Sequence, residues 1–385
     1  MLLYALLSLL LPVASAQLHS LAISSGLQYF GTATDNSELV DASLVSALSN
    51  HSEFGQVTPG NSQKWDSIEP GPNTFSFAKG DEIAALGKQN SQLLRCHTLV
   101  WFQQLPTWVQ NGTWTNETLI AAMENHITTT VTHYKGSCHS WDVVNEALEA
   151  DGSFRKSIFF STIGEAYLKI AFDATAAADP DVKLYYNDFG IETPGPKTSA
   201  ALNIVRSLKA SGTRIDGVGL QSHFIVGSTP SREVQIANLE SFTSLGVEVA
   251  ITELDIRMTL PSTAAQESQQ TTDYQNTASA CVAVANCVGL SVWGFSDKYS
   301  WVPSTFPGTG SACPFDENLA RKSAYYGIIA GLVGGSGPPS NAVTGANNSP
   351  LFFELNSTTM NSSGALLGSV RPRIYLLCVG AFIFV

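Results

Sequence analysis

Two acidic residues lie where the sequence could place the carboxyl groups of a hydrolytic site. Glu146 follows, after Asn145, the short apolar run that starts at Trp141, and Glu253 lies inside a run rich in β-branched residues. A pair of carboxyl groups can break a glycosidic bond when one protonates the leaving oxygen and the other acts at the anomeric carbon. The two acids therefore suggest acid–base chemistry on a sugar, provided that the fold brings them together.

The segments that must position these acids have the pattern of buried strands. The run around Val143 and Val144 is too short for a helix and rich in β-branched residues. In the second run, Glu253 and Asp255 fall on one face because strand side chains alternate. A carboxylate at the end of such a strand points to the edge of the sheet where substrates bind in α/β folds. A solvated glutamate would explain Glu146 alone; the second acidic strand favours a site.

The motif Trp-Asp-Val-Val-Asn-Glu, which ends at Glu146, and the motif Ile-Thr-Glu-Leu-Asp, which ends at Asp255, resemble the active-site strands of the family 10 glycoside hydrolases, the endo-xylanase family. Both motifs are long and specific, and the resemblance covers about residues 18–333. It implies a retaining reaction with carboxyl groups about 5–5.5 Å apart. It also implies that Glu146 is the acid/base and Glu253 the nucleophile.

The resemblance implies three supporting residues as well. Asn145 would hold the 2-hydroxyl of the sugar against Glu253, a contact that strengthens in the transition state. A single histidine in a strand is more often a core residue than a catalyst. The segment Gln-Ser-His-Phe around His223 nevertheless matches the family. His223, placed by Asp255, would therefore keep Glu253 ionised and oriented.

Further polar and aromatic residues are expected to bind the sugar chain. Asn61 and Lys64 follow a strand end, where amide and ammonium groups suit hydroxyl recognition, although a plain polar loop has the same composition. Asn187 is expected on the leaving-group side. Trp293 and Trp301 would wall the site against the hydroxymethyl group of glucose, if they are not core aromatics. The expected substrate-binding residues are Asn61, Lys64, His97, Trp101, Asn187, Gln221, Trp293 and Trp301.

Four positions depart from the pattern of the family. Gly60 stands where a glutamate is usual, so one sugar contact away from the cleavage point is expected to be missing. Phe102 replaces a histidine that normally contacts the sugar at the cleaved bond, which removes a hydrogen bond and leaves a more apolar wall. Gln63 replaces a methionine, and Cys96 replaces a glycine. Gly60 and Phe102 motivate a rival substrate, another β-glycoside such as a β-glucan or a plant glycoside.

Strand patterns alternate with helix patterns along the chain. Strands are predicted at residues 27–33, 54–59, 93–101, 140–146, 182–187, 217–224, 247–256 and 288–295. Helices are predicted at residues 38–49, 81–88, 119–134, 154–173, 200–210, 233–245, 272–285 and 322–332. Eight such repeats indicate the α/β class and a closed (β/α)8 TIM barrel. We expect a single catalytic domain followed by a disordered C-terminal tail.

The composition excludes some partners. The chain has 385 residues, of which 44% are hydrophobic, with 32 acidic and 20 basic residues and a net charge of -12. No basic cluster is present that could neutralise phosphates, which argues against a nucleic-acid partner. No cysteine or histidine spacing indicates a metal site, and no cofactor is expected. We expect a monomer that acts on xylan.

The sequence contains six cysteines, of which four can be paired. The spacing of Cys281 and Cys287 resembles a disulfide that is common in the family. Cys96 and Cys138 fall at the starts of the third and fourth expected strands. Neighbouring strands are about 4.8 Å apart, close to the Cα separation of a disulfide, so we predict that these two are bonded. Cys313 has no expected partner.

Both ends of the chain carry targeting patterns. An apolar run and an Ala-Ser-Ala cleavage site at residues 14–16 predict a signal peptide and secretion. The apolar run 374–385 would cover only about 18 Å as a helix, too short for a bilayer. Small residues and a spacer precede it, as in a GPI-attachment signal, although an uncleaved tail is the alternative. The expected parts are a signal peptide (1–16), the family 10 barrel (17–333), a Gly/Ser/Asn/Thr-rich linker (334–364) and a GPI propeptide (365–385).

These observations together predict a secreted, extracellular endo-1,4-β-xylanase held at the cell surface by a GPI anchor, its only contact with a membrane. A retaining hydrolase of another β-glycoside is the first rival. A non-catalytic, wall-bound barrel that only binds carbohydrate is the second. The presence of both acids together with Asn145, His223 and Asp255 argues against that second rival.

Overall fold

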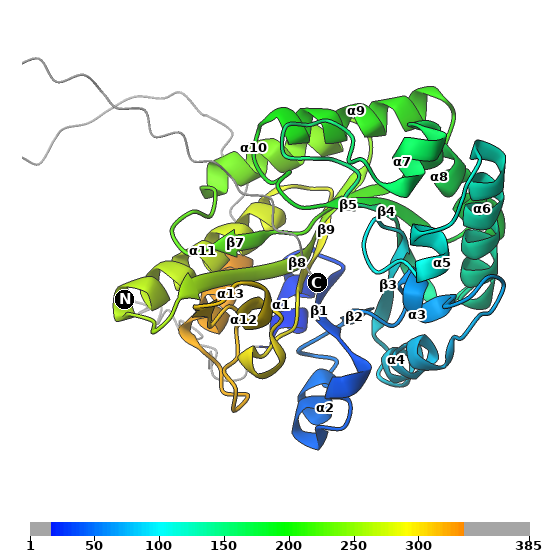
Figure 1. Ribbon diagram of the computed structural model, residues 1–385. Coiled ribbons are helices and arrows are strands. Elements are labelled where there is room, and N and C mark those ends of the chain that lie inside the picture. The colour runs from blue at the N-terminus through cyan, green and yellow to red at the C-terminus, as the bar shows by residue number, and fades with distance from the viewer. Residues whose placement is uncertain (1–16, 335–385) are drawn as a thin grey trace, which may run out of the picture. The chain divides into compact units, whose positions relative to one another are not determined.

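Eight parallel strands close into a barrel in the computed structural model, which describes residues 17–334 (Figure 1). Each strand pairs with the next, and the last strand pairs with both its predecessor and the first strand, which closes the ring. The predicted (β/α)8 barrel is therefore confirmed. The barrel strands are β1 (Tyr29–Thr34), β2 (Gln56–Pro59), β3 (Leu93–Val100), β4 (Cys138–Asn145), β5 (Lys183–Asp188), β6 (Gly217–Leu220), β8 (Glu248–Thr259) and β9 (Cys287–Val292).

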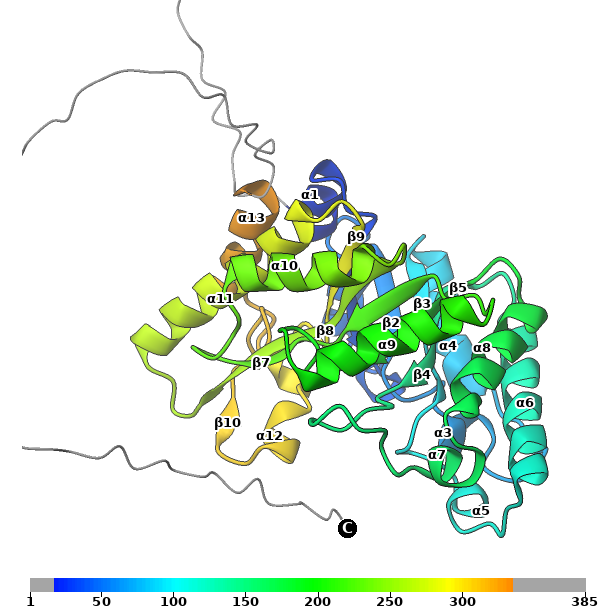
Figure 2. The ribbon, with the colours of Figure 1, turned by 90° about the horizontal axis from the view of Figure 1, so that it is seen from above.

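Helices surround the strands on the outside of the barrel (Figures 1 and 2). The two longest begin at side-chain caps: Thr115 caps α6 and Thr263 caps α11, each in a reciprocal capping box. The helices are α1 (Leu18–Ser24), α2 (Ala42–Leu48), α3 (Trp65–Ile68), α4 (Ala78–Gln89), α5 (Thr107–Gln110), α6 (Asn116–His133), α7 (Ile158–Ile163), α8 (Ala166–Ala178), α9 (Pro196–Ala210), α10 (Arg232–Thr243), α11 (Ala264–Ala283), α12 (Val302–Thr305) and α13 (Ser323–Gly334), with short 3₁₀ turns η2 (Asn36–Glu38) and η3 (Asp297–Tyr299).

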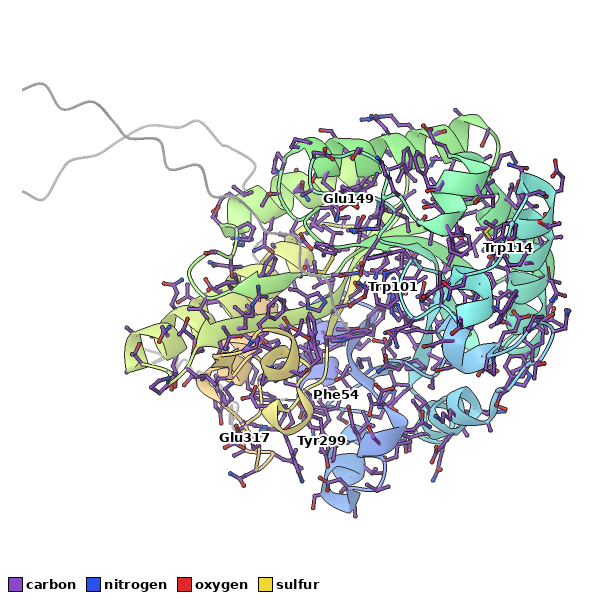
Figure 3. The ribbon with its side chains drawn as sticks, in the orientation of Figure 1. Phe54, Trp101, Trp114, Glu149, Tyr299 and Glu317 are labelled. Atoms are coloured by element: carbon purple, nitrogen blue, oxygen red, sulfur yellow. A yellow bond between two sulfur atoms is a disulfide. The ribbon has the colours of Figure 1, made fainter. Side chains whose placement is uncertain are left out.

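Buried side chains fill the layer between the strands and the helices as well as the inside of the barrel. In the outer layer Phe54, labelled in Figure 3, packs against Phe295, with ring centroids 4.9 Å apart, and against Phe315 at 6.4 Å. Charge is also buried inside the barrel, where the guanidinium of Arg95 pairs with the carboxylate of Asp142. A buried ion pair is tolerated where both partners are satisfied, and this one braces β3 against β4.

Several elements differ from their predicted extents, four of them clearly. The helix predicted over 154–173 is divided at Gly164, whose φ of 77° ends α7 before α8 begins. The strand predicted over 217–224 breaks at Ser222, whose φ is 63°, and a short strand β7 (His223–Ile225) follows. Strand β8 continues to Thr259 and pairs there with β10 (Thr309–Gly310), because β8 leaves the barrel as an extended ribbon. The helix predicted over 272–285 begins earlier, at Ala264.

Both predicted disulfides are present. Cys96 on β3 bonds to Cys138 on β4, with Cα atoms 5.7 Å apart, and Cys281 bonds to Cys287. Cys313 is a buried free thiol. Across residues 17–334 we find no helix that is long and apolar enough to cross a membrane. The predicted signal peptide, linker and GPI propeptide lie outside the described residues, apart from Gly334 at the edge of the linker.

Candidate active site

Glu146 follows the carboxyl end of β4, whereas Glu253 lies in the middle of β8, just beyond the residues that pair with β6. Glu146 is the first residue after β4, and its φ of 55° turns the backbone sharply out of the strand. Its N–H donates to the carbonyl of Asn187, at 2.9 Å, which fixes this turn to the end of β5. Glu253 lies in β8 and is 5% exposed. Left-handed backbone at a residue other than glycine costs about 1 kcal/mol or more and is concentrated at functional sites.

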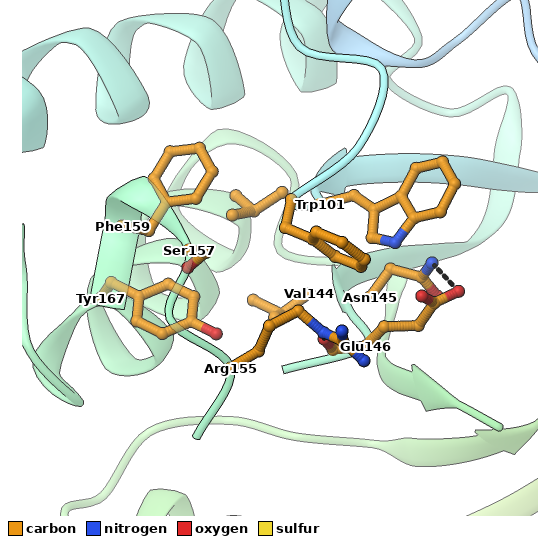
Figure 4. Close-up of a pocket in the computed structure, with 10 residues that line it drawn as sticks. Trp101, Val144, Asn145, Glu146, Arg155, Ser157, Phe159 and Tyr167 are labelled. Carbon is orange, nitrogen blue, oxygen red and sulfur yellow. Dashed lines mark hydrogen bonds between the residues drawn. The ribbon is translucent and has the colours of Figure 1, made fainter. Parts of the chain in front are cut away.

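A set of side-chain amides connects the two carboxylates. The Nδ2 atom of Asn187 donates to Oε1 of Glu253 at 2.8 Å and to Oδ1 of Asn145 at 2.9 Å. Asn145 Nδ2 donates to Oε1 of Glu146 at 3.2 Å, as Figure 4 shows. Gln221 Nε2 donates to the same oxygen of Glu146 at 3.0 Å. Three of the expected site residues therefore join the acids in one hydrogen-bonded cluster, and the buried amide of Asn187 contacts Glu253 directly.

His223 stands between two carboxylates. Its Nε2 atom is 3.2 Å from Oε2 of Glu253, and its Nδ1 atom is 3.0 Å from Oδ2 of Asp255. Burial alone would lower the pKa of His223, but the charge of Asp255 and then the contact with Glu253 raise it to about 10. Burial would raise the pKa of Glu253, but its hydrogen bond with His223 brings it below its ordinary value. The pair is therefore charged at neutral pH.

Trp301 extends this chain of contacts. Its indole Nε1 donates to Oδ2 of Asp255 at 2.7 Å, and its ring centroid lies 4.9 Å from that of His223. The sequence suggested Trp301 only as a wall of the site. Its N–H also holds the carboxylate that orients His223, a contact that an isolated tryptophan in a loop does not reveal.

The break in the strand at Ser222 aims Gln221 and His223 at the acids. The N–H of Ser222 donates to Oε1 of the buried Glu192 at 2.8 Å, which stabilises the left-handed residue. Beyond the break, His223 pairs with Asp255 in the register of β7 and β8. A one-residue break of this kind lets two nearby side chains reach the same cluster.

His97 contacts Trp293, whose ring also lies near that of His223, with centroids 6.4 Å apart. His97 Nδ1 is 2.9 Å from Oδ2 of Asp142, and its ring centroid is 5.3 Å from that of Trp293. Burial would raise the pKa of Asp142, but the guanidinium of Arg95 keeps it below its ordinary value. The ionised Asp142 thereby fixes the orientation of His97.

Lys64 and Asn61 belong to a polar cluster at the ends of β2 and β3. Lys64 Nζ donates to Oδ1 of Asn61 at 2.9 Å and to Oε1 of Gln104 at 2.5 Å. The same ammonium lies 4.7 Å from the centre of the Trp101 ring. Burial lowers the pKa of Lys64, which the negative charge of Glu253 opposes. The ring of Trp101 lies near Asn145 and Glu146 in Figure 4.

A carboxylate stands beside Gly60 despite the missing acid. Oδ1 of Asp35, at the end of β1, accepts the N–H of Asn61 at 2.9 Å, and the side chains of the two residues are also hydrogen-bonded. A Cβ atom on Gly60 would come within 2.9 Å of Oδ2 of Asp35. Asp35 therefore fills the space that a side chain at position 60 would take.

Phe102 contacts the loop that follows Glu146. The guanidinium carbon of Arg155 lies 4.1 Å from the centre of the Phe102 ring. Arg155 and Glu146 both line a small pocket with Trp101, Phe159 and Tyr167 (Figure 4).

Sequence reasoning missed five residues that hold this site together. Asp35 had a detectable signal, since a polar residue directly after a strand belongs to the same edge as the acids. The others act through contacts that the sequence pattern does not encode. The missed residues are Asp35, Gln104, Asp142, Arg155 and Glu192. Among residues 17–334, no group of three or more His, Cys, Asp or Glu residues could hold a metal ion.

Comparison with known proteins gives consistent matches. A family model described as glycosyl hydrolase family 10 matches residues 17–331. The chain is 58% identical over 325 residues to endo-1,4-beta-xylanase D of Talaromyces funiculosus, which covers 84% of this chain and 80% of that protein. It is 53% identical over 322 residues to an endo-1,4-beta-xylanase of Agaricus bisporus, and the match covers 84% of this chain and 96% of that protein.

A solved structure has the same barrel. The crystal structure of a GH10 xylanase from Bispora sp. MEY-1 with xylobiose has a TM-score of 0.80 and 46% identity, and the match covers 82% of this chain and 99% of that chain. The family model spans most of the chain, and relatives that are more than half identical span the same region. The chain therefore belongs to glycosyl hydrolase family 10.

Proposed function

We propose that the chain is a retaining endo-1,4-β-xylanase in which Glu253 is the nucleophile and Glu146 the acid/base. The observation that carries this proposal is the charged contact between His223 and Glu253 within the amide-linked pair of acids. A nucleophile must be ionised, which the contact between His223 and Glu253 supports, and a second carboxyl group is needed as the proton donor, a role for which Glu146 is available in the same hydrogen-bonded cluster. The relatives are named endo-1,4-beta-xylanases, which supports xylan as the substrate.

The first step forms a glycosyl-enzyme. Glu253, kept ionised by His223, attacks the anomeric carbon of the xylose whose bond is cleaved. The bond from that carbon to the bridging oxygen breaks, and Glu146 transfers its proton to this oxygen. The part of the xylan chain on the leaving side departs with a new hydroxyl group. Glu146 is left as a carboxylate.

The second step releases the sugar. Glu146, now ionised, takes a proton from a water molecule, whose oxygen attacks the anomeric carbon. The ester bond to Glu253 breaks and the carboxylate is regenerated with its contacts to His223 and Asn187. Two displacements at one carbon retain its configuration, and Glu146 is protonated again for the next cycle.

Neighbouring residues would position the sugar between the acids. The amide of Asn145 lies beside Oε1 of Glu146 and can exchange this contact for the 2-hydroxyl of the sugar. Trp293 and Trp301 flank His223, with ring centroids at 6.4 and 4.9 Å. Two indole rings at this place leave little room for the hydroxymethyl group of glucose, which favours a pentose.

Asn61, Lys64 and Gln104 would bind hydroxyl groups further along the glycone side of the chain. They form one hydrogen-bonded group next to the ring of Trp101. Such a group offers both donors and acceptors beside an aromatic face, the usual composition of a sugar subsite.

Secretion and anchoring are also part of the proposal. The Ala-Ser-Ala site before Gln17 supports export, and the small residues, spacer and apolar end of residues 361–385 support GPI attachment. Treatment of intact cells with a phosphatidylinositol-specific phospholipase should release xylanase activity into the medium. Activity that stays with the cells, or that is already in the medium before treatment, would contradict the anchor but not the activity.

Product analysis tests the activity itself. The full-length secreted protein should release short xylo-oligosaccharides from xylan and leave mixed-linkage β-glucan uncut. Hydrolysis of the glucan in preference to xylan would favour the rival β-glycoside, motivated by the apolar wall at Phe102. The Glu253→Ala variant is the control and should release no products, whereas the exposed Glu317→Ala variant should act as the wild type does.

A further inference from the structure

The backbone of Glu146 needs a support that the strand does not give. Its φ of 55° places it outside β4, so its carbonyl is not held by the parallel pairing that holds the strand. On one side its N–H is bonded to the carbonyl of Asn187. If the backbone of Glu146 can shift, its carboxyl group shifts as well. Proton transfer, however, requires the carboxyl group to be placed within a fraction of an ångström.

Arg155 supplies that support. Its Nε atom donates to the carbonyl oxygen of Glu146 at 3.1 Å, and NH2 donates to the carbonyl of Leu148 at 3.1 Å. NH1 lies 3.2 Å from a carboxylate oxygen of Glu149, and the backbone N–H of Arg155 donates to the carbonyl of Ala147 at 2.8 Å. One side chain and its own backbone thus hold four consecutive residues, beginning with Glu146.

Phe102 determines how the guanidinium lies. The guanidinium carbon is 4.1 Å from the ring centre, so the cation rests against the aromatic face. Phe102 follows β3, whereas Glu146 follows β4, so the contact connects two neighbouring strand ends across the pocket of Figure 4. A planar guanidinium against a ring has a defined orientation, and its donors point along fixed directions.

We propose that Arg155, packed against Phe102, is a positioning residue for Glu146. It fixes the position of the acid/base carboxyl group without contacting the substrate. The inference rests on the proposed function, because it presupposes that Glu146 donates the proton. It also gives the unusual Phe102 a role. At the position where the family usually has a sugar-contacting histidine, the aromatic ring of Phe102 instead packs against Arg155.

The leaving group distinguishes a misplaced acid from a damaged protein. A phenyl leaving group needs protonation, whereas a dinitrophenyl group departs without it. Loss of the acid therefore lowers kcat/KM for phenyl β-xylobioside and spares kcat/KM for the dinitrophenyl substrate. Loss of the base slows the second step and lowers kcat for the dinitrophenyl substrate, which azide restores because it attacks without base assistance.

The variants Arg155→Lys and Phe102→Leu test the proposal in the full-length protein. We expect each to lower kcat/KM for phenyl β-xylobioside about tenfold, part of the 10²- to 10⁴-fold that a general acid contributes. We expect kcat/KM for the dinitrophenyl substrate to change less than about twofold, as protonation does not assist that departure. Phe102→Tyr retains the aromatic face, so its kcat/KM for both substrates should stay close to the wild-type values. Arg206→Lys, at an exposed arginine on α9, is the matched control.

Glu146→Ala is the reference variant, because it removes the acid/base and should show the selective loss on the phenyl substrate and the rescue by azide. If it shows selective loss on the phenyl substrate and azide rescue while Arg155→Lys and Phe102→Leu do not, the positioning role is overturned and the proposed function stands. Equal losses on both substrates in the two variants would also overturn it, since that pattern indicates general disruption. If Glu146→Ala shows neither the selective loss nor the azide rescue, the assignment of Glu146 as the acid/base is wrong, and the proposed function fails in that part. Circular dichroism of each variant should match the wild type.

Discussion

The imidazole of His223 and the carboxylate of Glu253 form a charged contact, with 3.2 Å between Nε2 and Oε2. Each of the two side chains affects the ionisation of the other. The carboxylates on either side keep His223 protonated, and His223 keeps Glu253 deprotonated. Removal of either partner therefore changes the ionisation of the other, and the effect should be visible in pH dependence.

The acid limb of activity should depend on His223. In the His223→Gln variant, Glu253 loses the hydrogen bond that lowers its pKa, while the burial that raises it remains. We expect the acid limb of kcat/KM on xylobiosides to move to higher pH. The exposed pair of His133 and Asp81 offers a control, His133→Gln, which should leave the profile in place. An unchanged acid limb in His223→Gln would show that His223 does not set the ionisation of Glu253.

Stability should fall in alkaline solution because of the same residue. The pKa of His223 is raised to about 10 in the folded protein, so its stabilising contribution is fully present below the ordinary histidine value of about 6.5 and is lost as the pH rises through about 10. Between these values the slope for one proton is about 1.4 kcal/mol per pH unit. Urea unfolding at pH 6 and pH 9 should show a larger loss for the wild type than for His223→Gln. Equal losses would contradict the raised pKa.

Glycine at position 60 should matter for the binding of longer substrates. In Gly60→Ala the new Cβ would lie 2.9 Å from Oδ2 of Asp35, so the carboxylate must move and its bonds to Asn61 must weaken. We expect KM for xylo-oligosaccharides to rise about fivefold, equivalent to one hydrogen bond of about 1 kcal/mol. We expect little change in kcat, because Asn61 is hydrogen-bonded to Asp35, Lys64 and Gln104 rather than to the two acids. Gly195→Ala, where a Cβ meets open space, is the control. A fall in kcat with KM unchanged would contradict this prediction.

The two disulfides should differ in their contribution to stability. The bond between Cys96 and Cys138 closes a separation of 42 residues, whereas that between Cys281 and Cys287 closes only 6. Loop-closure entropy makes the longer bridge more stabilising by about 2 kcal/mol. We therefore expect the double serine variant of Cys96 and Cys138 to lose more in thermal unfolding than that of Cys281 and Cys287. A larger loss from the short loop would show that packing outweighs chain entropy here.

Strand pattern was sufficient to predict the barrel, and the resemblance of two motifs to the family supplied the candidate site residues that the structure brings together. Glu146 and Glu253 could be predicted because each ends or occupies an apolar run, and in a parallel barrel the strand ends converge. Alternation placed Asp255 on the face of Glu253, whereas His223 was expected only from the resemblance of its Gln-Ser-His-Phe segment to the family; the register of β7 and β8 pairs the two residues. These are properties of local sequence that the closed sheet turns into proximity.

The supporting contacts could not be predicted in this way. Ser222 breaks its strand although it is not a glycine, because the buried carboxylate of Glu192, from another loop, holds its N–H. Arg155 contacts mainly backbone carbonyls, which every residue has, so no pattern of residue types marks it. Asp35 follows a strand and could have been noticed for that reason, but its bond to Asn61 could not be read from the sequence. Such contacts depend on tertiary placement.

The pairing of β1 with β9 has a consequence for the synthesis of the protein. Tyr29–Thr34 leaves the ribosome early, but the partner that covers one of its edges, Cys287–Val292, is made last among the barrel strands. Throughout elongation the nascent barrel therefore exposes an open edge strand, the kind of surface that recruits chaperones or pairs with a neighbouring chain. A pause in translation before residue 287 would prolong that exposure, so the yield of folded protein should be sensitive to codon usage in the last third of the barrel.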